Sequence, residues 1–242
     1  MNNLLLLSAL TCSLVLTPAL LAQKDSSRGT SDLKEKKISL RLLAVDLLDG
    51  AKEVIIRSGG ANQESPFKSQ PLFIPTGNLS HPVLVPQRNI TLSLLPQGEE
   101  KIGRIVAQAK LPQTGRSFLI LLVPIKQQQK YLCRIVRLDD PAFRKGQICF
   151  FNLSKLPVIG KLGNKIFKVP PSKISIAKPT PQADLPYYEV RLFYKHGNKT
   201  RSLANTRWPY DDRSRSYIFF FSKGERLTYR AIDEVLHTPK DR

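Results

Sequence analysis

Apolar and polar side chains alternate along several stretches of the chain. In residues 89–94 the apolar positions are Ile90, Leu92 and Leu94, and polar residues stand between them. Residues 105–111 show the same period of two. That period places successive side chains on opposite faces of a β-strand. Both stretches are therefore predicted to be strands with one face on a core and the other in water.

Two further stretches are almost continuously apolar, namely residues 117–123 (SFLILLV) and 217–221 (YIFFF). Both are too short to be convincing helices, so they are predicted to be central strands that are covered on both faces. Further strands are expected over residues 38–45, 53–57, 131–138, 147–152, 173–177, 187–194 and 227–232.

These strands are divided by turns rich in Pro and Gly, of which the chain has 18 and 13. The pattern predicts an all-β protein with a two-sheet antiparallel sandwich, immunoglobulin-like or jelly-roll-like, over residues 38–177. Residues 178–186 form a Pro-rich connection. Residues 187–236 are then too few for an independent core, so we expect a β-meander that packs on the sandwich or completes it. Residues 237–242 form a tail, and no internal repeat is visible in the sequence.

The first 22 residues have the composition of a secretory signal peptide, with an apolar run at residues 4–16 and no charged side chain. Residues 23–37 are polar and charged apart from Leu33, so they are expected to form a flexible tether. We therefore expect an exported protein, periplasmic or extracellular. No later segment is long and apolar enough to span a membrane as a helix.

The chain is strongly basic, with a formal net charge of +19. All of this charge belongs to the mature protein, because residues 1–22 carry none. Outside the cytoplasm such a charge favours anionic polysaccharide, lipid head groups or another envelope protein as partner. The alternative is that Lys and Arg are scattered over the surface for solubility. Nucleic acid is not an expected partner, because the sequence contains no nucleic-acid-binding motif.

Cys133 and Cys149 remain after removal of the signal peptide, which contains Cys12. If residues 131–138 and 147–152 form a hairpin centred on residue 141, the two cysteines lie opposite each other. They would then be either a disulfide or two buried thiols. Two thiols without a nearby His do not indicate a zinc site.

Catalytic groups are not recognisable in the sequence. The histidines His81, His196 and His237 have no identifiable partner, and the carboxylate pairs at 99–100, 139–140 and 211–212 could serve a hydrolase only if folding gathered two groups in one cleft. No catalytic, metal-binding or cofactor-binding residue is assigned, and no cofactor is expected.

The stretch TRWPYDDRSRSYIFFF (206–221) gathers the chain's single Trp with Tyr, Phe, Arg and an Asp pair. Its end is expected to be core strand. The candidates for a ligand-contact loop are Arg207, Trp208, Tyr210, Asp211, Asp212, Arg213 and Arg215. There Trp208 could stack on a sugar ring while the charged groups bind its substituents. Alternatively, Trp208 packs over the edge of the sandwich and the carboxylates pair with nearby arginines.

Three functional hypotheses follow. The first is an exported, non-enzymatic β-sandwich protein that binds a partner or an anionic surface. The second is a carbohydrate-binding module that uses the Trp208 loop. The third is a hydrolase with an unrecognised carboxylate or His site.

Overall fold

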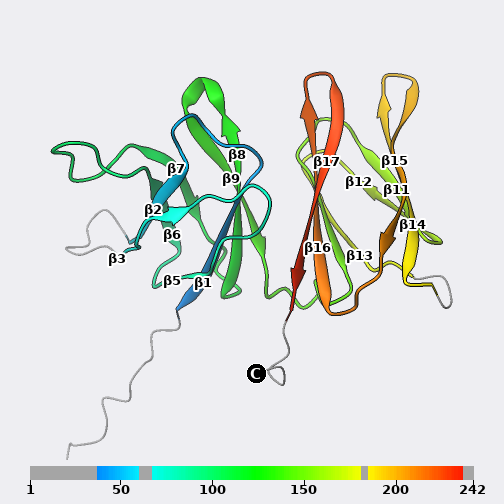
Figure 1. The fold of residues 1–242 in the computed structure, drawn as a ribbon, viewed down its shortest axis with the longest axis horizontal. Helices are drawn as coiled ribbons and strands as arrows, with labels where there is room; N and C mark the ends of the chain where they lie inside the picture. Colours follow the sequence, from blue (N-terminus) through cyan, green and yellow to red (C-terminus); the bar gives the residue numbers. More distant parts are fainter. Residues whose placement is uncertain (1–36, 60–66, 181–184, 237–242) are drawn as a thin grey trace, which may run out of the picture. The chain divides into compact units, whose positions relative to one another are not determined.

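The computed structural model describes residues 37–59, 67–180 and 185–236 (Figure 1). The first strands are β1 (Ile38–Ala44), β2 (Glu53–Ser58), β3 (Phe67–Lys68), β4 (Leu72–Phe73), β5 (Val83–Val85), β6 (Asn89–Ser93), β7 (Ile105–Lys110), β8 (Ser117–Ile125) and β9 (Lys130–Arg137). A 3-10 turn, η1 (Lys126–Gln128), joins β8 to β9. The later strands are β10 (Ile148–Asn152), β11 (Val158–Leu162), β12 (Lys165–Val169), β13 (Ile174–Ala177), β14 (Tyr187–His196), β15 (Lys199–Pro209), β16 (Ser214–Lys223) and β17 (Arg226–Val235).

The predicted all-β class and sandwich architecture are confirmed. In the described residues the strands form four sheets. We call them the first outer sheet (β3-β2-β6-β7, with β4 beside β2), the first inner sheet (β5-β1-β8-β9), the second inner sheet (β13-β10-β16-β17) and the second outer sheet (β12-β11-β14-β15). Within the same ranges, no helix has the length and apolar character needed to cross a membrane.

The two halves of the chain have the same topology, although no repeat is visible in the sequence. The inner sheets correspond strand by strand, β5-β1-β8-β9 with β13-β10-β16-β17. The outer sheets correspond in the same way, β3-β2-β6-β7 with β12-β11-β14-β15. Each half contains one parallel pair, β1 with β8 and β10 with β16, among antiparallel pairs. The strands of residues 187–236 complete both sheets of the second half. The Pro-rich connection lies between β13 and β14, inside that half.

Each half encloses its own apolar core. In the first half, Leu40 on β1 and Phe118 on β8 pack with Val54 and Ile56 on β2. In the second half, Phe150 on β10 and Phe220 on β16 take part in the equivalent contact, with Val158 on β11 and Val190 on β14. An outer sheet therefore covers one face of each inner sheet.

A third core joins the two inner sheets. It contains Leu119 and Leu121 of β8 together with Phe151, Tyr217 and Phe219 of β10 and β16. The intervening residues of β8 and β16 point into the cores of their own halves. Strands β8 and β16 are thus buried on both faces, as their continuous apolar sequences predict.

The outer sheets resemble each other at one equivalent position. On β2, Val54 and Ile56 point into the first core, so Ile55 and Arg57 lie on the outward face. On β11, Val158 points into the second core, so Ile159 and Lys161 lie outward. A basic residue therefore occupies the same place on each outward face.

Strand β15 forms an edge of the second outer sheet and pairs with β14 along its length. The pairing shifts register at Leu192/Phe193, where β15 has an extra residue. Such a bulge bends a strand and increases its twist. The edge strand ends at Pro209, which cannot donate a backbone hydrogen bond.

Gly160 is required by close packing in the second core. The ring of Phe167 stacks on Phe150 with centroids 4.3 Å apart. A Cβ atom at Gly160 would lie 2.2 Å from ring atoms of Phe167 and 2.9 Å from Leu192 Cδ2. A side chain at this position would therefore displace the Phe167 ring.

We expect Gly160→Ala to lower the free energy of unfolding by about 1–3 kcal/mol, because overpacking forces the surrounding side chains to move. Gly77→Ala is the matched control, since a Cβ there would meet no atom within 4 Å. Urea unfolding of both variants measures the difference. Equal stability of the two variants would contradict the packing described for Gly160.

Candidate functional site

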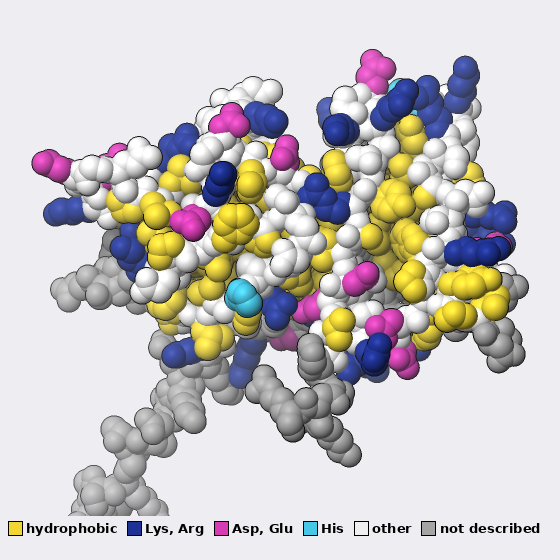
Figure 2. Space-filling view, viewed as in Figure 1, with side chains coloured by type: hydrophobic (Ala, Val, Ile, Leu, Met, Phe, Trp, Pro, Cys, Tyr) yellow, Lys and Arg dark blue, Asp and Glu magenta, His cyan; other side chains and the backbone are white. Residues whose placement is uncertain are grey.

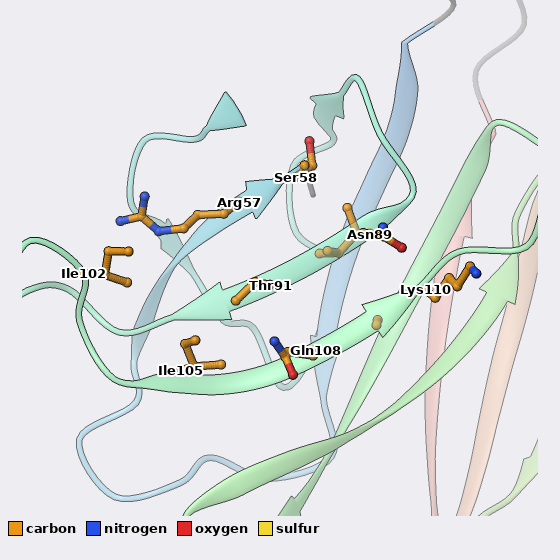
Figure 3. Close-up of a pocket in the computed structure, with 11 residues that line it drawn as sticks. Arg57, Ser58, Asn89, Thr91, Ile102, Ile105, Gln108 and Lys110 are labelled. Atoms are coloured by element: carbon orange, nitrogen blue, oxygen red, sulfur yellow. The ribbon is translucent and has the colours of Figure 1, made fainter. Parts of the chain in front are cut away.

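A cavity of about 670 Å³ lies on the outward face of the first outer sheet (Figure 3). Arg57, Thr91 and Gln108 are neighbours across β2, β6 and β7 and form one row of its lining. Asn89 and Lys110 form the next pair along β6 and β7. The cavity has the size of a small-molecule site and is lined by hydrogen-bonding groups as well as apolar ones.

The guanidinium group of Arg57 lacks a partner in this cavity. Its Nε and Nη2 atoms are buried, and neither makes a hydrogen bond within the described chain. A buried donor without an acceptor costs free energy, so such groups call for an explanation. Sequence reasoning missed Arg57, because period two places it on an outward face but does not show that a cavity forms there.

A second cavity, of about 850 Å³, lies between the two inner sheets, near the β16–β17 turn. Figure 2 shows the surface hollowed between the two halves at the top of the view. Arg230 lines this cavity, and its guanidinium group donates hydrogen bonds to the carbonyl oxygens of Val45 and Thr76, both at 2.8 Å. Arg230 therefore links the two halves, and Lys155 and Lys223 are the exposed cations of this lining.

The outward face of the second outer sheet is basic. The strand register places these cations on it: Lys161, Lys168, Arg191, Lys195 and Arg207. The carboxylate on this face is Glu189, which pairs with Arg191 at 3.3 Å. Ile159 and Ile166 are exposed between the charges. Figure 2 shows Lys and Arg side chains at the right-hand side of the view, beside β14 and β15.

Trp208 lies on the inner side of β15. Its ring makes a T-shaped contact with Tyr188, with centroids 6.3 Å apart, and a tilted contact with Tyr229 at 6.1 Å. Trp208 and Tyr210 are half-buried side chains packed against the second core. This placement favours packing at the sandwich edge over a stacking platform for a sugar ring.

The rest of the expected loop is divided among different places. Arg207 lies on the outward face of the sheet, with its guanidinium carbon 5.0 Å from the centroid of the Tyr187 ring. Asp211 accepts hydrogen bonds from the backbone N–H and the side-chain Nε of Arg213, both at 3.0 Å, and these bonds lower the pKa of Asp211. Asp212 is exposed. The structure therefore does not gather these residues into one site.

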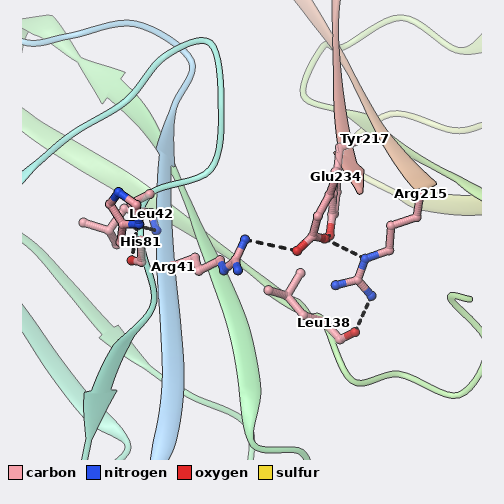
Figure 4. Close-up of polar contacts among 8 residues, drawn as sticks. Arg41, Leu42, His81, Leu138, Arg215, Tyr217 and Glu234 are labelled. Atoms are coloured by element: carbon pink, nitrogen blue, oxygen red, sulfur yellow. Dashed lines mark hydrogen bonds and ion pairs between the residues drawn. The ribbon is translucent and has the colours of Figure 1, made fainter. Parts of the chain in front are cut away.

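Arg215 is buried and belongs to a polar network between the inner sheets (Figure 4). Its Nε donates to Glu234 at 2.7 Å, and its Nη1 donates to the Leu138 carbonyl oxygen at 2.6 Å. Glu234 also accepts from the Tyr217 hydroxyl at 2.6 Å and from Arg41 at 3.1 Å. Burial raises the pKa of the Tyr217 hydroxyl well above its usual range. Arg215 thus has a structural role in this network.

The expected pairing of Cys133 with Cys149 is wrong. Strands β9 and β10 lie in different sheets, so Cys133 faces Leu122 on β8, whereas Cys149 lies between Ile176 and Tyr217. Both cysteines are free. Burial raises the pKa of Cys133 to about 11 and that of Cys149 to about 12, so both thiols stay protonated at neutral pH.

Among the described residues, the histidines and the paired carboxylates do not gather in a common cleft. His81 and His196 are exposed, and His237 lies outside the described residues. Burial raises the pKa of Asp139, but hydrogen bonds from Arg137 and the Arg116 backbone outweigh that effect and lower it overall. Within residues 37–59, 67–180 and 185–236, no group of three or more His, Cys, Asp or Glu could hold a metal ion.

Comparison of the chain with models of protein families finds no match, and comparison with curated proteins finds no match either.

We expect Glu234→Ala to lower the free energy of unfolding by about 3–5 kcal/mol, because it leaves the buried Arg215 without its carboxylate. Asp46→Ala is the control, since Asp46 forms an exposed ion pair with Lys126 at 3.8 Å. Its loss should cost about 0–1 kcal/mol. Chemical denaturation measures both values. A loss for Glu234→Ala no larger than the control's would refute a structural role for the network.

Proposed function

We propose that the protein is an exported, non-enzymatic binding protein that attaches to an anionic surface through its second outer sheet. The observation that carries the proposal is the positive charge of the outward face. On its strands the cations outnumber the carboxylates, of which Glu189 is the one present. That carboxylate already pairs with Arg191 and offsets little of the field of the other cations. A face of this kind attracts lipid head groups and acidic polysaccharides through the charge that both carry.

The exposed isoleucines support the same proposal. Ile166 is 77% exposed and Ile159 is 44% exposed, and both stand among the basic residues. Apolar side chains surrounded by cations add contact area once the charges have drawn an anionic surface close. A sugar site at Trp208 has less support, because the indole packs on Tyr188 and Tyr229.

Export is supported by the signal-like sequence of residues 1–22. We expect the mature protein to begin close to residue 23, since the apolar run ends in small residues that suit cleavage. Intact-mass measurement of the protein recovered outside the cytoplasm tests this. Full-length protein retained in the cytoplasm would overturn the export proposal.

Attachment is tested with a triple variant of the basic face, Lys161→Gln, Lys168→Gln and Arg207→Gln. A matched control, Lys52→Gln, Lys130→Gln and Lys145→Gln, removes the same charge from exposed positions outside that face. At about 1 kcal/mol per basic residue near an anionic membrane, the first variant should bind anionic vesicles roughly a hundredfold more weakly. The control should lose much less affinity.

Binding is measured by co-sedimentation with anionic vesicles and with an acidic polysaccharide, which separates the two kinds of surface. Wild-type binding to at least one of them should weaken as salt rises through about 0.15 M, where the screening length is about 8 Å. Equal losses for the two triple variants would show that the charge acts diffusely and would overturn the assignment to this face. Binding of wild type to neither surface would overturn the proposal itself.

A further inference from the structure

We propose that the cavity on the first outer sheet binds a carboxylated sugar, with the carboxylate held by Arg57. This site goes beyond the surface attachment proposed above, because it lies on a different sheet and uses none of the residues of the second outer sheet. The two proposals can therefore fail independently.

The guanidinium of Arg57 presents a free edge. Its unpartnered atoms, Nε and Nη2, are the pair whose N–H groups point in the same direction. Two parallel N–H groups match the two oxygens of a carboxylate and bind it through two hydrogen bonds. Both atoms are buried, so the groups that cover them must move aside for a carboxylate to reach them; the carboxylate would then supply the missing acceptors.

Polar side chains continue from Arg57 across the sheet. Thr91 and Gln108 are its neighbours on β6 and β7, and adjacent strands are about 4.8 Å apart. Asn89 and Lys110 stand in the next row. Hydroxyl and amide groups both donate and accept hydrogen bonds, which is what sugar hydroxyls require. Figure 3 shows these side chains rising from neighbouring strands.

The remaining lining is apolar. Ile102 and Ile105 are 53% and 41% exposed and border the cavity beside Arg57. They offer a surface for the C–H groups of a sugar ring, while Lys110 adds a second positive charge at the far end of the polar rows. The described lining residues include no carboxylate that would compete for Arg57. Charge, hydrogen-bonding groups and apolar surface together fit an acidic sugar.

The probe is oligogalacturonic acid, whose sugars carry carboxylates, with its carboxyl-reduced form and dextran sulfate as comparisons. Isothermal titration calorimetry on the mature protein is done at about 0.5 M salt, where attraction to the exposed basic face is screened. It should show binding of oligogalacturonic acid and at least tenfold weaker binding of the reduced form. Arg57→Gln should weaken binding about tenfold or more, since hydrogen bonds to a charged group are lost. Arg57→Lys should also weaken it, because an ammonium lacks the paired edge.

Arg226→Gln is the matched control, since it removes an exposed Arg from β17, away from both the cavity and the basic face, and should leave the affinity within about twofold. Arg57→Met separates binding from folding: it removes the unpartnered donors, so its thermal midpoint should equal or exceed that of wild type. A marked fall in that midpoint would indicate a structural role for Arg57 and overturn the proposal. So would unchanged affinity in Arg57→Gln, or wild-type binding of dextran sulfate alone.

Discussion

The two inner sheets are buried against each other, so their central strands must be apolar on both faces. Leu119 and Leu121 of β8 meet Phe219 of β16 in this contact, and the residues between them fill the cores of the two halves. With both faces of the inner sheets covered, the outward faces of the outer sheets are left for polar and charged side chains. The contact between the two inner sheets therefore explains why Arg57 and Lys161 lie on the outer sheets, although neither residue takes part in that contact.

A carboxylate inside the same interface sets its polar pattern. Glu234 has a side chain only 11% exposed and accepts hydrogen bonds from Arg41 of the first half and from Arg215 and Tyr217 of the second. Taking these charges out of water costs several kcal/mol, which the surrounding hydrogen bonds offset. The network is directional, unlike the apolar contact around it, and so restricts how the two inner sheets can slide past each other. Arg230, bonded to carbonyl oxygens of the first half, adds a second directional link.

Sequence periodicity predicted most of the strands, but it missed β3, β4, β5, β11, β12 and β15, and it did not show which strands pair. The apolar runs around Leu121 and Phe219 correctly predicted strands covered on both faces, because such strands need apolar residues at successive positions. The pairing of Cys133 with Cys149 failed because the chain leaves the first inner sheet after β9 and starts the second with β10, which short-range symmetry cannot reveal. The shared topology of the two halves was not predicted either, because no repeat is visible in the sequence. Arg57 was missed because its cavity depends on the register of three strands.

The edge formed by β15 shows what the basic residues do beyond attracting a partner. An unpaired strand edge can recruit a second copy of the chain and start aggregation. On β15, Lys199, Arg201 and Arg207 would approach the same charges of an added strand, and like charges on facing strands repel. The bulge and Pro209 further spoil the flat, regular ladder that polymerisation needs. The charges, the bulge and Pro209 thus disfavour the addition of a second copy of the chain along β15, which is one of the sheet edges of the protein.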